Sequence, residues 1–254
     1  MEKHSTLKEL FYKRKYLFLF IALLLPYLFH PFKSSDVMGI SILDISFTLL
    51  IYVAIFTVGT MKKIPYTLLT IALVGQFLTW SSYYFKGYGL TIASQATTAV
   101  FLVYIGSIIL HRIILNQDVT SNTIFAALCI YLLMALSWAF IYSIIYSTVP
   151  NSFYMNDKFF SSQSENFFQI SKLYYFIYFS FCTITTLGFG DIIPAVPISR
   201  MCASLEAMGG QLYLMVLVSR LVSMHINNQN RIRHLTATLT QGKEILTLRA
   251  DKTK

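Results

Sequence analysis

The sequence predicts an all-α membrane protein with six transmembrane helices and a short re-entrant helix between the fifth and the sixth. Of its 254 residues, 56% are hydrophobic and only 12% are charged, whereas soluble domains are about 45–50% apolar and about 25% charged. Six apolar stretches reach or approach the roughly 20 residues that cross a bilayer as a helix. This composition excludes a soluble enzyme, a disordered chain and a nucleic-acid-binding module, so the net charge of +9 is attributed to membrane topology.

The first span, residues 16–32, is short, and Pro26 and Pro31 are expected to kink or end it. With the basic residues 13–15 in front it could be mistaken for a signal peptide. We prefer a retained helix, because the segment carries large residues to its end and has no small-residue cleavage site. The other spans are expected at residues 40–60, 64–85, 90–115, 123–149 and 198–226.

Most of the 20 basic residues fall on one side of the membrane if the six spans alternate in direction. That side carries Lys3, Lys8, Lys13, Arg14, Lys15, Lys62, Lys63, Arg112, Arg231, Arg233, Lys243, Arg249, Lys252 and Lys254. The other side carries Lys33, Lys86, Lys158, Lys172 and Arg200, and Arg220 lies within the last span. A basic excess marks the cytoplasmic side, so residues 1–15 and the tail 227–254 are expected inside the cell. The absence of an N-x-S/T sequon is typical of a prokaryotic inner (plasma) membrane protein.

A stretch between the fifth and sixth spans fits neither a loop nor a span. Residues 151–166 are polar and are expected outside the cell, whereas residues 170–185 are apolar and aromatic but too short to cross. They lead directly into the glycine segment, residues 183–191, with the sequence TITTLGFGD. A short apolar helix followed by glycines predicts a re-entrant hairpin, which is tolerated at membrane depth only where it is buried in protein or lines water.

The glycine segment resembles the selectivity filter of potassium channels, T-x-x-T-x-G-Y-G-D. The run YFSF at 178–181, the run DIIP at 191–194 and Gly210 extend this resemblance to the bacterial two-helix pore module over residues 123–226. Residues 16–115 resemble only the four-helix domain that precedes such a module in six-helix channels. The resemblance implies a channel without enzymatic activity that conducts K+ passively. Because one chain holds one filter, it also implies a homotetramer.

The resemblance assigns roles to individual residues, with K+ as the permeant ligand and no other cofactor. The ion-binding oxygens would come from Thr186, Leu187, Gly188, Phe189 and Gly190. Glycine adopts positive φ at little cost, so Gly188 and Gly190 are expected there. Filter support and the outer mouth would involve Thr185, Cys182 and Asp191, and Gly210 would be an inner-helix hinge.

Three residues depart from the family pattern. Phe189 replaces the commoner tyrosine, whose hydroxyl braces the filter against aromatic side chains of the pore helix. Leu187 replaces valine or isoleucine, which is a mild change in packing. Cys182 stands where some relatives carry a carboxylate, and a thiol cannot replace an ionised acid. Filter rigidity and inactivation are therefore expected to differ from the family pattern, while potassium selectivity is retained.

The fourth span lacks the arginine ladder of a voltage sensor. Residues 90–110 contain no lysine or arginine, and only His111 and Arg112 follow at the expected cytoplasmic end. Moving one charge through 100 mV is worth about 2.3 kcal/mol, so steep gating needs several charges. A charge-poor four-helix domain and weak voltage dependence are expected.

Carboxylates within membrane spans are candidates for a functional role. Asp44 lies near the outer end of the second span, where an interfacial, hydrated side chain is the simpler interpretation. Glu206 lies one turn before Gly210 and is expected either to bond structurally to hydroxyls behind the pore helix or to respond to pH. Further candidates form an inner-helix row that either lines the cavity and gate or packs on the fifth span: Gln211, Leu214, Val218, Val222 and Ile226. The basic tail is expected to contact anionic lipid.

Three alternatives remain open. The first is a weakly selective cation channel, because Phe189 replaces the commoner tyrosine of the filter. A potassium transporter subunit is disfavoured, because such chains carry four filter-like loops and this one carries a single copy. A membrane scaffold or sensor without conduction is the third alternative.

Overall fold

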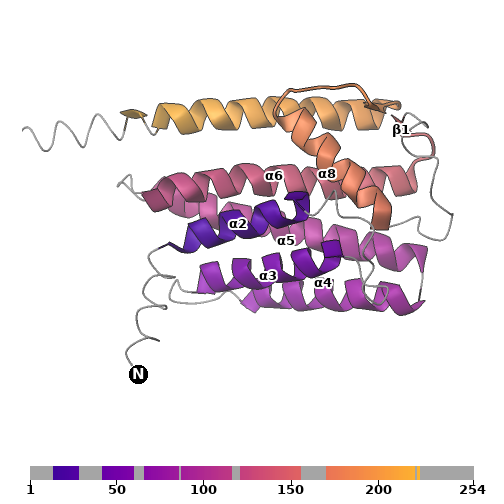
Figure 1. The fold of residues 1–254 in the computed structure, drawn as a ribbon, viewed down its shortest axis with the longest axis horizontal. Helices are drawn as coiled ribbons and strands as arrows, with labels where there is room; N and C mark the ends of the chain where they lie inside the picture. The colour runs from indigo at the N-terminus through magenta and orange to yellow at the C-terminus, as the bar shows by residue number, and fades with distance from the viewer. Residues whose placement is uncertain are drawn as a thin grey trace, which may run out of the picture.

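The computed structural model describes residues 14–28, 42–59, 66–85, 87–115, 121–155, 170–220 and 222–223. These residues are mostly helical (Figure 1). The elements are α2 (Lys15–Leu28), α3 (Ile42–Gly59), α4 (Tyr66–Phe85), α5 (Tyr88–Leu115), α6 (Ser121–Thr148), β1 (Phe153–Met155), α8 (Ile170–Ile184), β2 (Ile192–Pro194) and a final helix, Pro197–Arg220, called the 197–220 helix. The long helices run along the long axis of the molecule, and α8 is tilted across them between α6 and the 197–220 helix (Figure 1).

Each of the six predicted spans corresponds to a helix in the described part of the chain, with boundaries that differ by a few residues. Three helices are long and apolar enough to cross a membrane by length and composition: Tyr88–Leu115, Asn122–Thr148 and Pro197–Arg220. Lys15–Leu28 and Ile45–Gly59 are shorter apolar helices, so six membrane crossings remain a prediction. Pro26 lies inside α2, in the last turn of its described residues, and the expectation that it kinks or ends the helix remains a prediction.

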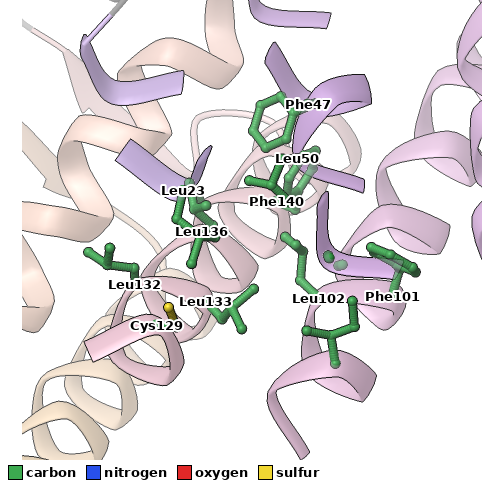
Figure 2. Close-up of a cluster of buried hydrophobic side chains, with 14 of the residues drawn as sticks. Leu23, Phe47, Leu50, Phe101, Leu102, Cys129, Leu132, Leu133, Leu136 and Phe140 are labelled. Atoms are coloured by element: carbon green, nitrogen blue, oxygen red, sulfur yellow. The ribbon is translucent and has the colours of Figure 1, made fainter. Parts of the chain in front are cut away.

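Helix α6 is the central element, because it packs against α2, α5 and α8. Figure 2 shows Leu23 of α2, Phe47 and Leu50 of α3, and Leu102 of α5 gathered with α6 side chains in one apolar cluster. The rings of Phe47 and Phe140 meet edge to face at 5.2 Å. Helices α2, α3 and α5 are thus joined to α6 by side-chain packing, and α4 packs against α5.

A second cluster, which is aromatic, surrounds Phe153 of β1. Its ring lies 5.0 Å from Phe176, 5.5 Å from Phe179 and 5.7 Å from Tyr142, edge to face in each case. Strand β1 pairs antiparallel with β2, with Tyr154 opposite Ile193. The strand after α6 therefore anchors both α8 and the chain that follows the glycine segment.

Several predicted features lie outside the described residues. These are the N-terminal residues 1–13, Pro31, Ile226 and the tail 227–254, together with the side chain of Asp44.

Candidate functional site

The glycine segment overlaps the last turn of α8, which ends at Ile184. The Leu187 N–H donates to the Cys182 carbonyl (2.8 Å), and the Thr186 N–H donates to the Thr183 carbonyl (3.0 Å). These two bonds satisfy carbonyls that the last turn of a helix otherwise leaves unpaired. The Thr185 hydroxyl also turns back, donating to the Phe181 carbonyl at 2.6 Å. The segment therefore leaves α8 along a path fixed by hydrogen bonds.

The backbone of the glycine segment alternates in handedness. Thr186, Gly188 and Gly190 have φ values of 58°, 59° and 77°, while Leu187 and Phe189 between them do not have positive φ. The expectation of positive φ at the two glycines is confirmed. Thr186 was not expected there, and a β-branched residue with positive φ is a genuine outlier. Such strain persists only where the surrounding structure imposes it, and it clusters at functional sites.

The glycine segment is exposed in the single chain beyond the end of α8, from Thr185 onward. All residues from Thr185 to Asp191 are exposed, with Leu187 at 59% and Phe189 at 66% of their full accessible area. Cys182, in contrast, is buried in the last turn of α8. Two large apolar side chains are thus presented on a backbone strip that the described part of the chain leaves uncovered.

Phe189 stacks on α8 rather than bonding to it. Its ring lies parallel to that of Tyr178, with centroids 6.4 Å apart and planes inclined by 3°. The Tyr178 hydroxyl interacts with the side chains of Asp191 and Cys182, and Asp191 Oδ1 accepts the Ile192 N–H at 3.0 Å. Stacking on Tyr178 therefore supports the glycine segment, although Phe189 has no hydroxyl that could bond to α8.

Two neighbouring helices fix the end of α8 at Ile184. Tyr131 of α6 donates its hydroxyl to the Ile184 carbonyl at 3.0 Å. On the other side lies Gly210, where an added Cβ would stand 2.5 Å from Ile184 Cγ1 and 3.0 Å from the Ile184 carbonyl oxygen. Contacts of 2.5 Å do not occur with real Cβ atoms, so glycine allows the 197–220 helix to approach α8 here. A hinge at Gly210 remains a prediction.

Glu206, one turn before Gly210, is fully buried among three elements. Its Oε2 accepts the hydroxyl of Tyr142 of α6 at 2.6 Å, and its Oε1 is in hydrogen-bond contact with Ser180 of α8. Ser180 Oγ also lies 2.6 Å from the Ala135 carbonyl of α6. The carboxyl group therefore joins the 197–220 helix to both α6 and α8.

The end of the site that follows Asp191 is held by the start of the 197–220 helix. Ser199 Oγ donates to the Ser152 carbonyl at 2.8 Å and faces the Val196 N–H at 3.3 Å. A proline at the first helical position and a polar side chain reaching back to the cap residue are typical of helix starts. This helix start is thereby tied to Ser152, which directly precedes β1 of the strand pair.

The other end of the 197–220 helix is joined to α5. Arg220 Nη2 donates to the carbonyls of Ile113 (2.5 Å) and Ile114 (2.9 Å). A cation at the C-terminus of a helix is favoured by the unpaired carbonyls and the helix dipole. The helix that follows the glycine segment is therefore linked to the last of the first four helices.

The structure places the remaining predicted residues along the 197–220 helix and just beyond. Gln211, Val218 and Val222 are exposed, and Leu214 is half-buried. Sequence reasoning missed Tyr131, Tyr142 and Ser180 as partners of this site. Their only sequence signal is the presence of hydroxyls within apolar helices, which does not tell which helix they face.

Comparison with known proteins covers this same part of the chain. A family model described as "Ion channel" matches residues 118–227. The match spans α6, α8, the glycine segment and the 197–220 helix. It therefore includes both partners of every site contact described above except the bonds from Arg220 to carbonyls of α5. No curated protein and no solved structure matches the chain. The apolar helices and this match indicate a membrane protein whose residues 118–227 are similar to the ion-channel family.

Proposed function

We propose that the protein is a potassium-selective channel, in which four identical chains place their glycine segments around one axis. The alternation of φ along residues 186–190, with positive values at Thr186, Gly188 and Gly190, is the observation that carries this proposal. A strip that alternates in handedness turns its N–H groups to one side and its carbonyls to the other. Carbonyls gathered in this way can replace the hydration shell of an ion.

The chemistry requires no group transfer and no catalytic residue. K+ gives up its water to carbonyls from Thr186, Leu187, Gly188, Phe189 and Gly190, and the Thr186 hydroxyl adds an oxygen at the inner end. Helix α8 directs its C-terminal end, which carries partial negative charge, toward the start of the strip. Asp191 at the outer mouth would raise the local cation concentration.

The exposure of apolar residues supports the homotetramer. Leu187 and Phe189 are exposed in the single chain, as are Met208, Leu212 and Met215 of the 197–220 helix. Contact with identical chains would cover part of this surface, and lipid would cover the rest. In the tetramer Gly210 is the proposed hinge, and Leu214, Val218, Val222 and Ile226 are the proposed rings of the inner pore, below Gln211. The proposal also includes cytoplasmic termini and contact of the basic tail with anionic lipid.

Selectivity is tested by flux from purified protein reconstituted into liposomes. With equal gradients of K+ and Na+, we expect K+ efflux to exceed Na+ efflux by at least about a hundredfold, which is about 2.7 kcal/mol of discrimination. Barium, a cation of similar radius, should block the flux. Comparable K+ and Na+ rates would instead favour the weakly selective cation channel, which the missing hydroxyl on Phe189 keeps as the second candidate. Absence of any flux would favour a non-conducting scaffold or sensor.

Conductance is expected to depend only weakly on voltage. Helix α5 carries basic residues only at His111 and Arg112, in its last turns. Without charges inside the membrane field, a change of 100 mV supplies little of the about 2.3 kcal/mol per charge that drives gating. Current recorded from a planar bilayer over both polarities checks this. A steep, saturating conductance–voltage curve with several gating charges would contradict it.

A further inference from the structure

The contacts around Glu206 contain fewer hydroxyl hydrogens than oxygen–oxygen contacts. Three such contacts form a chain: Tyr142 Oη with Glu206 Oε2, Glu206 Oε1 with Ser180 Oγ, and Ser180 Oγ with the Ala135 carbonyl. The Tyr142 and Ala135 contacts are both 2.6 Å long, the separation of O–H···O hydrogen bonds. Each of the three contacts needs one hydrogen between its two oxygen atoms.

Tyrosine and serine each supply a single hydroxyl hydrogen, and a carbonyl oxygen supplies none. Tyr142 donates its hydrogen to Oε2 of Glu206. Ser180 can donate its hydrogen either to the Ala135 carbonyl or to Oε1 of Glu206, but not to both. If Glu206 were ionised, one of these two contacts would bring lone pairs together without a hydrogen. The third hydrogen must therefore come from the carboxyl group.

We propose that Glu206 is a neutral carboxylic acid that positions α8 through an ordered hydrogen-bond chain. Tyr142 donates to Glu206 Oε2, Glu206 donates from Oε1 to Ser180 Oγ, and Ser180 donates to the Ala135 carbonyl. The chain begins and ends on α6, passing through the 197–220 helix and α8. Loss of the acid proton would remove one link and loosen α8 from its neighbours.

The surroundings of Glu206 agree with a neutral group. The titratable side chains that interact with it are Tyr142 and Tyr131 of α6, and Cys202 of its own helix interacts with Tyr142, while α8 faces Glu206 with Ser180. Within the described ranges, no basic side chain pairs with the carboxyl group. Burying a carboxylate without a counter-ion is strongly unfavourable, whereas the neutral acid requires only hydrogen bonds, which it has.

Infrared spectroscopy of the purified protein tests directly whether the Glu206 carboxyl group is protonated. The test does not depend on whether the protein conducts ions. The carbonyl stretch of a protonated carboxylic acid should be present in the native protein and absent from Glu206→Gln. Asp191→Asn, which changes an exposed carboxylate, is the control and should leave the band unchanged. A native spectrum without a band that depends on Glu206 would overturn the proposal.

Substitutions test the positioning role, which rests on the proposed channel function. In Glu206→Gln, the new amide would donate to Ser180 and accept from Tyr142, reproducing the pattern of the neutral acid, so this variant should keep the K+ flux within about twofold of native. Glu206→Ala and Ser180→Ala should each lower the flux about tenfold, the equivalent of roughly 1.4 kcal/mol. Ser137→Ala is the matched control, because among the described residues this buried serine bonds only within its own helix, to the Leu133 carbonyl at 2.6 Å.

The outcomes separate the two proposals. Glu206→Gln as damaging as Glu206→Ala would contradict the ordered chain, since an ionised group cannot be mimicked by an amide. A native protein that shows the band but carries no flux would refute the proposed channel function and leave the protonated acid in place.

Discussion

Replacing Gly210 by alanine is expected to remove most K+ flux and to destabilise the assembly. The added Cβ would lie 2.5 Å from Ile184 Cγ1 and 3.0 Å from the Ile184 carbonyl oxygen. The carbonyl is backbone at the end of α8 and is already held by the Tyr131 hydroxyl, so the relief must come from moving α8 or the 197–220 helix. Overpacking of this kind costs about 1–3 kcal/mol per site, and it moves the start of the glycine segment. We expect at least a tenfold loss of flux in liposomes.

Gly209 provides a matched control for this change. It is the adjacent glycine of the same helix, and an added Cβ there would meet only Met134 Cε, at 4.0 Å. Gly209→Ala should therefore keep near-native flux and stability. The double variant Gly210→Ala with Ile184→Ala should recover part of the flux, because it removes the closest of the two contacts but leaves the carbonyl. Equal effects of alanine at 209 and 210 would contradict the packing role assigned to Gly210.

Replacing Gly188 by alanine is expected to abolish K+ flux through the backbone rather than through a clash. Gly188 has φ of +59°, and no atom of the described residues lies within 4 Å of an added Cβ. An L-residue in this conformation costs about 1–2 kcal/mol, which four chains around one axis would multiply to about 4–8 kcal/mol. The strip would leave its alternating conformation, and its carbonyls would no longer face a common side.

Gly106 separates the backbone effect from a general sensitivity to alanine. It lies within α5, where φ is not positive, and an added Cβ also meets nothing within 4 Å. Gly106→Ala should leave flux intact and raise the thermal stability slightly, since alanine favours a helix over glycine by about 1 kcal/mol. Flux is measured in liposomes for both variants at equal protein content. Native flux in Gly188→Ala would contradict the role given to the alternating backbone.

The helices and the backbone of the glycine segment at its two glycines were predictable, because both depend on local sequence. Apolar runs bounded by polar or basic residues placed the helices to within a few residues, and the glycines predicted positive φ at 188 and 190. Thr186 was not predictable, because its positive φ opposes its own preference and is imposed by the surrounding structure.

The contacts that hold the site together depend on packing between distant segments. Glu206 was recognisable as unusual, but Tyr142 and Ser180 lie 64 and 26 residues away from it. The Tyr131 bond to Ile184 spans 53 residues. Many hydroxyl side chains occur on these helices. Which of them contact Glu206 or the end of α8 depends on how α8 crosses α6.

Imaging the purified protein by electron cryomicroscopy in a K+ buffer tests the central claim most directly. We predict four chains related by a fourfold axis, with the backbone oxygens of residues 186–190 directed at that axis and ion density between them. Glycine segments that lie apart from one another, or that direct their carbonyls away from a shared axis, would contradict the proposed channel.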